Sequence, residues 1–387
     1  MSGSQRMKTG SLTQITRGDM KPLISIVIPI HNIESVLPQC LNSIIEQSFR
    51  DLEIIAVDGA SDDGSGKLID EIAMCESRLI AIHIDEAGPG KARNEGVKRA
   101  SGEYVWFVDG DDIIPAGSLG VIADRIKVTH PDVLFIDYEA FYPNGRCEPG
   151  HGHDLMGRQT AEYFTLSEQP WVVGLSMASW NKIIRREFFM ATSVTFPKTS
   201  PHEDIPVSCM LMLQAGRLSI LNRVCYSYRK GRPGSFMIAD RKILASDSSR
   251  RHFNIFYAYE DVLDGIRDRE EKGKAVTRQV RYEFFERAIC HYAAILDDGK
   301  LGIGSFGGIG LIARSDRHEF FEMMHHDYLK YLPARYKKPG GFRGVKFQLI
   351  SKNAYWVYTL LDPANKVRMQ MDRGARRMLR RVRQHAR

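Results

Sequence analysis

Apolar runs of strand length alternate with amphipathic stretches along the first third of the chain. Continuous apolar runs are typical of strands that are buried on both faces, and they predict strands at 24–30, 52–57, 79–84, 104–108 and 132–138. Apolar residues with a helical period predict helices at 34–47, 65–74 and 90–100. This alternation implies right-handed crossovers and an α/β fold with a mostly parallel sheet flanked by helices.

The alternation weakens beyond Pro143. A Gly-, His- and Pro-rich stretch predicts a loop at 144–157, and the following pattern predicts helices at 180–189 and 204–215 and a short strand at 224–228. From about Arg241 onward the pattern is helical, most clearly at 282–296. The glycine-rich segment 301–310 lacks the Lys-Ser/Thr pair of a phosphate loop, so we interpret it as a turn between helices. We therefore expect a disordered leader at 1–22, an α/β domain at 23–238, a helical C-terminal extension at 239–364 and a tail at 365–387.

Three carboxylates follow the fourth predicted strand within four residues: Asp109, Asp111 and Asp112. In open α/β sheets, ligands bind outside the carboxyl ends of the strands. The spacing of Asp109 and Asp111 suits one hard cation, Mg²⁺ or Mn²⁺, which takes oxygen ligands and couples one or two carboxylates to phosphate oxygens. Taken alone, the same stretch is also typical of a solvated turn.

Other polar residues stand at neighbouring strand ends. His31 and Asn32 close the first strand and are suited to hold a planar base or a ribose, or only to cap the next helix. Asp58 closes the second strand and can accept a hydrogen bond from a nucleobase imide or a sugar hydroxyl, or belong to a helix-capping turn. Lys91 and Arg93 lie near the start of a helix, where they face either a phosphate or solvent.

Taken together, these motifs resemble glycosyltransferase family 2, the nucleotide-sugar-dependent transferases of GT-A fold. The resemblance covers roughly residues 23–236 and leaves out the helical C-terminal third. The order and spacing of its elements are more specific than any one of them. They are Val27-Ile28-Pro29-Ile30-His31-Asn32, Ala56-Val57-Asp58, Gly90-Lys91-Ala92-Arg93-Asn94-Glu95-Gly96, Gly102-Glu103-Tyr104 with Asp109-Gly110-Asp111-Asp112, Ser179-Trp180-Asn181-Lys182, His202-Glu203-Asp204, and Tyr226-Ser227-Tyr228-Arg229 with Gly234-Ser235.

The resemblance implies a donor site for a nucleoside diphosphate sugar. Asp58 matches the acid that bonds the base, and His31 stands where these enzymes usually place Tyr. Asp109 and Asp111 match the DxD pair, with Asp111 as the expected direct ligand of Mn²⁺ or Mg²⁺. The implied donor-binding residues are Pro29, His31, Asn32, Asp58, Arg93, Asn94, Asp109, Asp111, Arg229 and Arg232.

The resemblance also implies an acceptor side. Asp204 matches the catalytic base, with Glu203 as the alternative, and it would take a proton from an acceptor hydroxyl. A single in-line displacement then inverts the anomeric configuration. We assign Trp180 and Lys182 to the acceptor site; packing between domains is the alternative for Trp180.

Two departures from the family pattern bear on the nucleobase. The usual Asp-Asp-Gly-Ser is here Asp58-Gly59-Ala60-Ser61, and His31 replaces Tyr. Both departures concern the identity of the nucleobase more than the chemistry. A uridine nucleotide is expected on the family resemblance alone. No GxGxxG follows the first strand, which excludes a Rossmann dehydrogenase. A non-catalytic nucleotide-sugar-binding or scaffold protein with the same fold is the remaining alternative.

The net charge of +7 is concentrated in the tail. From Lys366 to Arg387 there are nine Lys or Arg residues and one Asp, a net charge of +8, so the rest of the chain carries −1. A narrow apolar stripe (Val367, Met371, Ala375, Met378, Val382 and Ala386) runs along this segment. Such a helix suits an anionic membrane surface; a subunit contact in a homo-oligomer or an anionic polymer are the alternatives.

Composition limits the compartment and the partners. The six cysteines form no CxxC pair, which suits a reducing compartment. The first 20 residues contain no apolar signal region, and no apolar run is long enough to span a bilayer. No nucleic-acid recognition module is present. We therefore expect a cytoplasmic, metal-dependent, inverting glycosyltransferase, peripheral on the inner face of the membrane, that extends a cell-surface polysaccharide or a lipid-linked glycan.

Overall fold

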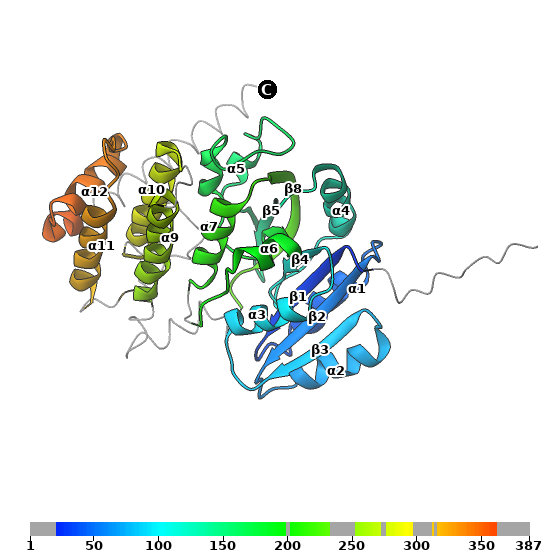
Figure 1. The fold of residues 1–387 in the computed structure, drawn as a ribbon. Coiled ribbons are helices and arrows are strands. Elements are labelled where there is room, and N and C mark those ends of the chain that lie inside the picture. Colours follow the sequence, from blue (N-terminus) through cyan, green and yellow to red (C-terminus); the bar gives the residue numbers. More distant parts are fainter. Residues whose placement is uncertain are drawn as a thin grey trace, which may run out of the picture.

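The computed structural model describes residues 21–198, 202–232, 252–271, 276–296, 312 and 316–361 (Figure 1). Within these residues, eight strands form one sheet in the order β3-β2-β1-β4-β7-β5-β6, with β8 paired to β5. The strands are β1 Ile24–Ile30, β2 Leu52–Gly59, β3 Leu79–Ile84, β4 Tyr104–Phe107, β5 Val133–Phe141, β6 Cys147–Pro149, β7 Lys182–Arg185 and β8 Leu218–Arg229.

The sheet joins a parallel half to a mixed half. β1 pairs in parallel with β2 and β4, and β2 pairs in parallel with β3. β7 lies antiparallel between β4 and β5, and β8 is parallel to β5. The carboxyl ends of β1, β2, β3 and β4 therefore meet at one edge of the sheet.

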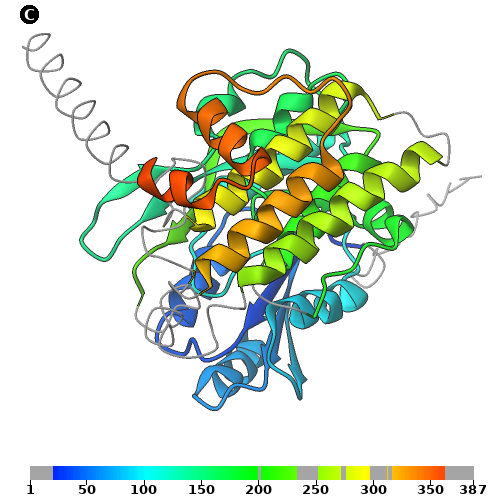
Figure 2. The ribbon, with the colours of Figure 1, turned by 90° about the vertical axis from the view of Figure 1, so that its left-hand side faces the viewer.

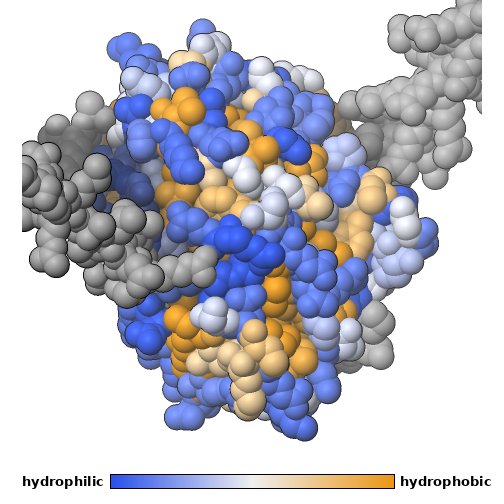
Figure 3. Space-filling view, turned by 90° about the vertical axis from the view of Figure 1, so that its right-hand side faces the viewer, coloured by the Kyte–Doolittle hydropathy of each residue, from blue (hydrophilic) through white to orange (hydrophobic). Residues whose placement is uncertain are grey.

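Helices cover both faces because the strands are apolar on both sides. Ile26 and Ile28 pack toward α1 (Leu37–Ile45), α2 (Ser65–Cys75) and α4 (Ser118–Thr129), while Val27 packs toward α3 (Pro89–Arg99). The second face also contacts α6 (Arg186–Thr192) and α7 (Asp204–Gln214). On the side of the molecule that is at the right in Figure 1, hydrophobic residues are interspersed with hydrophilic ones (Figure 3).

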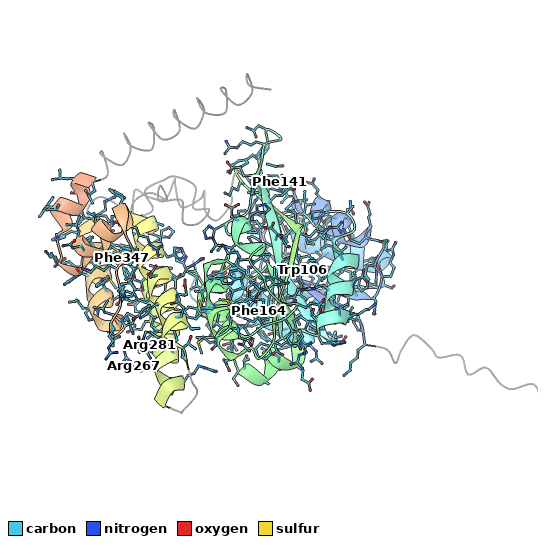
Figure 4. The ribbon with its side chains drawn as sticks, turned by 90° about the horizontal axis from the view of Figure 1, so that it is seen from above. Trp106, Phe141, Phe164, Arg267, Arg281 and Phe347 are labelled. Carbon is cyan, nitrogen blue, oxygen red and sulfur yellow. The ribbon has the colours of Figure 1, made fainter. Side chains whose placement is uncertain are left out.

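A layer of helices follows the sheet and packs beside α7. It consists of α9 (Asn254–Glu271), α10 (Arg278–Leu296), α11 (Arg317–Tyr331) and α12 (Gly341–Ser351), which lie side by side (Figures 1 and 2). Seen from above, Trp106 lies in the α/β part and Phe347 in this layer (Figure 4). The apolar core continues from one part into the other through residues such as Leu211, Tyr259 and Phe284. Among the described residues, no helix has an apolar run long enough to cross a bilayer.

The predicted fold class and most predicted elements are confirmed. Two predictions were wrong. Segment 180–189 is not one helix: it contains strand β7 followed by the start of α6, because residues 182–185 pair with β4 and β5. The predicted loop at 144–157 contains β6 and the short helix α5 (His153–Met156).

Other elements differ from the sequence prediction in extent. The strand predicted at 224–228 is the end of the longer β8, and α4 was not predicted. The domain boundaries predicted near residues 238 and 364, the segment 301–310, the leader up to residue 20 and the basic tail fall outside the described residues.

Candidate functional site

Arg93 is a buried cation that joins two distant acids. It projects from α3, and its guanidinium donates to Asp109 Oδ1 at 2.7 Å and to Glu203 Oε1 at 2.8 Å. Burial opposes the charge, but the two carboxylates raise the pKa of Arg93 above its ordinary value. The ring of Phe196 lies 5.4 Å from the guanidinium carbon and closes one side. The end of β4 and the start of α7 are thereby held at one site.

The three acids after β4 have different surroundings. Asp112 is fully buried and accepts hydrogen bonds from the Tyr226 hydroxyl at 2.5 Å and from the Arg229 backbone N–H at 2.7 Å. Burial, followed by the charges of Asp111 and Asp109, raises its pKa well above the ordinary value. Both carboxylate oxygens of Asp112 are therefore used within the protein, so Asp112 fixes the loop rather than binding a ligand.

Asp109 and Asp111 remain the candidate ligand acids. Asp111 accepts a hydrogen bond from Arg232 Nε at 3.2 Å, and burial and the charge of Asp109 raise its pKa. Gly110 between them is closely packed, since a Cβ there would lie 2.5 Å from Ile33 Cδ1. A side chain at this position would therefore require the Ile33 side chain to move.

Arg229 reaches the same loop from the end of β8. Its Nε donates to the Asp111 carbonyl at 2.6 Å and its Nη2 to Gln39 Oε1 at 2.6 Å. The guanidinium also lies over the ring of Phe141 at 4.7 Å. The structure thus brings Arg229 and Arg232, both predicted to bind the donor, to the acidic loop.

Trp180 lies inside an aromatic stack that supports the acidic loop after β4. Its ring is 4.5 Å from that of Tyr226 and 5.5 Å from that of Tyr228, nearly parallel to both, and it is 7% exposed. The geometry favours the packing alternative over direct contact with an acceptor sugar. Through Tyr226, whose hydroxyl also accepts from the Asp109 backbone N–H at 3.1 Å, Trp180 helps to fix the turn.

Lys182 is buried and its ammonium group is fully used. It donates to the carbonyl oxygens of Ser176 and Ala178 and to Asn181 Oδ1, at 2.9, 2.7 and 2.8 Å. Burial lowers the pKa of Lys182 to about 7, with the charge of Asp204 acting in the opposite direction. Three acceptors exhaust its three protons, so this geometry gives Lys182 the task of holding the loop before β7 rather than an acceptor sugar.

The carboxylates of Glu203 and Asp204 differ in their hydrogen bonding. Glu203 is paired with Arg93, whereas within the described part of the chain the Asp204 carboxylate makes no hydrogen bond. Burial, followed by the charge of Glu203, raises the pKa of Asp204 to about 7, against the opposing charges of Arg93 and Lys182. A carboxylate with free oxygens and a pKa near neutrality is suited to accept a proton.

His31 and Asn32 lie at the edge formed by β1 and β2. The His31 ring is exposed and its Nδ1 lies 2.7 Å from the Gly59 carbonyl. Asn32 has φ +52°, and its side-chain oxygen accepts from the Asp62 backbone N–H at 2.9 Å, so it fastens the turn after β2. Pro29 is half-buried within β1. His31 therefore presents an accessible ring at this edge.

Asp58 is buried beside a histidine that the sequence reasoning missed. Its Oδ1 accepts from the Ser61 backbone N–H at 3.3 Å, and its Oδ2 lies 3.3 Å from His83 Nδ1. In the sequence His83 is only a single polar residue in the apolar run 79–84, and its pairing with Asp58 becomes visible in the β2–β3 register.

Asn94 does not line the site with a free amide. It donates to the Phe196 carbonyl at 2.8 Å and accepts from the Phe196 backbone N–H at 2.9 Å. This closed pair holds segment 194–197 against α3. Its contribution is thus to place Phe196 beside Arg93, and the predicted donor contact through its amide is not favoured.

The acidic loop suits a hard divalent cation that takes most of its ligands from a bound diphosphate rather than from the protein. Within the described residues, no group of three or more His, Cys, Asp or Glu side chains could hold a metal ion. Asp109 and Asp111 supply two carboxylates, which is the number that Mg²⁺ or Mn²⁺ commonly takes from protein when phosphate oxygens supply the rest. The donor set is therefore compatible with a metal that arrives with a diphosphate.

Comparison with known proteins agrees with these features. The family model "Glycosyl transferase family 2" matches residues 25–190. The chain is 27% identical over 219 residues to the uncharacterized glycosyltransferase EpsJ of Bacillus subtilis, covering 54% of this chain and 62% of EpsJ. It is 31% identical over 217 residues to the poly(ribitol-phosphate) β-N-acetylglucosaminyltransferase TarS of Staphylococcus aureus, covering 55% of this chain and 36% of TarS. The matched region thus spans less than two thirds of either relative.

The fold is similar to that of a solved transferase. A crystal structure of S. aureus TarS 1-349 in complex with UDP-GlcNAc superposes with a TM-score of 0.65 at 22% identity, covering 90% of this chain and 92% of that one. At this identity the likeness establishes the fold alone. The structural likeness extends beyond the sheet, because the superposition covers 90% of this chain whereas the family model matches only residues 25–190.

Proposed function

Because this chain carries a glycosyltransferase family 2 domain of GT-A fold, we propose that it transfers a sugar from a nucleoside diphosphate sugar to a hydroxyl group of a glycan acceptor. The observation that carries the proposal is the double pairing of Arg93 with Asp109 and Glu203. This pairing connects the acids that suit a leaving diphosphate with the acids that suit an acceptor hydroxyl. A binding or scaffold protein does not need the acids that suit an acceptor hydroxyl.

On the donor side, the residues of the chain hold and orient the leaving group. Asp109 and Asp111 would hold Mn²⁺ or Mg²⁺, which when bound offsets the charge that develops on the departing diphosphate. Arg229 and Arg232 lie at the same loop and add positive charge where the phosphates would sit. Asp58 lies on β2, two strands from β4, and His31 follows β1, the strand next to β4; both are at the same sheet edge, where they would bind the nucleobase.

On the acceptor side, Asp204 would take the proton of the attacking hydroxyl. Its pKa of about 7 makes it a stronger base than an ordinary carboxylate while leaving much of it ionised near neutral pH. Glu203 is held by Arg93 and keeps the pKa of Asp204 raised. A single displacement at the anomeric carbon then inverts its configuration.

The relatives support one class of donor and acceptor over others. TarS is named for adding N-acetylglucosamine to poly(ribitol-phosphate), and its structure holds UDP-GlcNAc. We therefore propose a uridine diphosphate sugar as donor and a cell-surface polysaccharide or a lipid-linked glycan as acceptor. A lipid-linked acceptor fits a cytoplasmic enzyme that its basic tail holds at the inner face of the membrane.

The test is a screen of nucleoside diphosphate sugars with Mn²⁺, read by thermal shift and by release of nucleoside diphosphate. We expect uridine diphosphate sugars to raise the melting temperature and to be turned over when acceptor glycans are added. Asp204→Asn should bind the same donor without transfer, and Asp111→Ala should lose donor hydrolysis and transfer. Near-normal transfer by Asp204→Asn would exclude it as the base, and binding without turnover across all acceptors would favour a scaffold.

A further inference from the structure

His83 lies between two carboxylates at the nucleobase end of the sheet. It belongs to β3, in register with Asp58 on β2. Its Nδ1 is 3.3 Å from Asp58 Oδ2, and its Nε2 is 3.0 Å from Asp70 Oδ1 on α2. Both ring nitrogens therefore face an acceptor, so only the imidazolium form can donate to both acids at once.

The environment of the ring favours that form. Asp70, through its hydrogen bond, and Asp58 raise the pKa of His83, and burial opposes them. The charged groups that face the ring are Asp58 on β2 and Asp70 on α2. The side chain of His83 is 47% exposed, so it exchanges protons with solvent, whereas that of Asp58 is only 8% exposed.

The remaining contacts of Asp58 leave its orientation dependent on His83. The Ser61 backbone N–H reaches Oδ1 at a long 3.3 Å. Gly66, in the first turn of α2, packs so closely that a Cβ there would lie 2.9 Å from Asp58 Oδ2. Backbone atoms thus enclose the Asp58 carboxylate on two sides, and His83 is the charged side chain that fixes Asp58 Oδ2.

We propose that His83 is a positioning residue that aims the Asp58 carboxylate at a base carrying an imide N–H, and so selects a uracil nucleotide over a cytosine nucleotide. The inference rests on the proposed function, in which Asp58 meets the nucleobase. Uracil presents a donor at N3, which an anionic oxygen accepts. Cytosine presents an acceptor at the same position, which the same oxygen repels.

The ring also makes this selection dependent on pH. Below its raised pKa, the imidazolium of His83 holds both Asp58 and Asp70. As pH rises through that pKa the ring loses one proton, one nitrogen becomes an acceptor facing a carboxylate, and the hold on Asp58 weakens. Selection for uracil is therefore expected to fall as pH rises.

The experiment compares UDP and CDP, with Mn²⁺ present, by calorimetric titration of the full chain between pH 5.5 and 8.0. The two nucleotides differ only in the base, so titration of their phosphates cancels in the ratio of Kd values for CDP and UDP. Two substitutions separate the two contacts. In His83→Asn the amide nitrogen occupies the position of Nδ1 and can reach Asp58; in His83→Gln it occupies the position of Nε2 and can reach Asp70.

His83→Asn is expected to keep the CDP to UDP ratio near the wild-type value at low pH and to lose its decline with rising pH. His83→Gln should lower the ratio about five- to tenfold at low pH, because the bond to Asp58 is gone. Glu71→Gln, a charge change one position from Asp70 on an exposed side chain, is the matched control and should leave the ratio unchanged. Thermal unfolding of each variant confirms that it is folded.

The outcomes separate the inference from the proposed function. Wild-type protein that binds UDP, with both His83 variants showing the wild-type ratio at every pH, overturns the role of His83 and leaves the donor assignment standing. Wild-type protein that binds neither nucleotide, or binds them equally, overturns the assignment of Asp58 and the inference with it. A CDP to UDP ratio that is lowered in His83→Gln but not in His83→Asn supports both the role of His83 and the assignment of Asp58.

Discussion

Glu203 and Arg93 form a buried ion pair of 2.8 Å between side chains 110 positions apart in the sequence. The same guanidinium holds Asp109 at 2.7 Å, so one cation connects the start of α7 with the loop after β4. The pair therefore fixes the distance between the proposed leaving-group side and the proposed base side.

We expect Arg93→Met to destabilise the fold by about 3 kcal/mol, because it leaves two carboxylates without their buried cation. Transfer activity should fall at least 100-fold, since both sides of the site lose their connection. Urea unfolding and initial rates measure the two effects. Arg99→Met, on the exposed side of the same helix, is the control and should change either value little; similar losses in both variants would mean that the effect comes from α3 itself.

The pKa of Asp204 predicts how the rate depends on pH. If Asp204 is the base, kcat/KM should rise with pH to a plateau, with a midpoint near about 7, because only the carboxylate accepts a proton. Asp204→Asn should remove transfer while UDP binding stays within about threefold of the wild-type value. A rate profile without an inflection near neutrality would exclude this assignment.

The same raised pKa has a consequence for stability. Because the folded state binds a proton at Asp204 more tightly than the unfolded chain does, its contribution is present below the ordinary pKa of about 4 and is lost as pH rises through about 7. Asp204→Asn should therefore be more stable than the wild type at pH 8, by about 1 kcal/mol, with a smaller difference at pH 5. Thermal unfolding at the two pH values tests this, and an equal difference at both would contradict it.

Tyr226 is expected to act through Asp112 and the Asp109 backbone. Tyr226→Phe removes the hydroxyl that donates to Asp112 and accepts from the Asp109 N–H, and it should cost about 1–3 kcal/mol of stability. It should also weaken Mn²⁺-dependent UDP binding, since the turn that carries Asp109 and Asp111 loses its support. Tyr228→Phe is the matched control, because within the described residues the Tyr228 hydroxyl makes no hydrogen bond while its ring stacks on Trp180 in the same way.

Elements with a strong, uninterrupted pattern could be predicted from the sequence. β1 and β3 have the predicted ends because their apolar runs are bounded by polar turns. β7 could not be predicted, because residues 182–185 directly precede a helix and become a strand only through pairing with β4 and β5. Local pattern says nothing about partners that lie some 50 to 80 positions earlier in the chain.

The site was predictable in its residue types and less so in their tasks. Asp109, Asp111, Glu203 and Asp204 were named from motif order, and the structure brings them together. The sequence does not show which polar atoms are already used: Asn94 and Lys182 look available until the bonds to Phe196 and to the loop before β7 are seen. His83 was overlooked for the converse reason, since one histidine in an apolar strand carries no signal until its register with Asp58 is known.

The basic tail gives the last prediction, which concerns the membrane. Deleting residues 365–387 removes a net charge of +8, so the truncated protein should no longer sediment with liposomes that contain anionic lipid, while donor binding stays unchanged. Substituting Gln for Arg376, Arg377, Arg380 and Arg381 keeps the apolar stripe and should weaken liposome binding strongly, because each charge near such a surface contributes about 1 kcal/mol. Neutral liposomes are the control. Unchanged liposome binding together with a smaller sedimentation coefficient after truncation would show instead that the tail joins subunits.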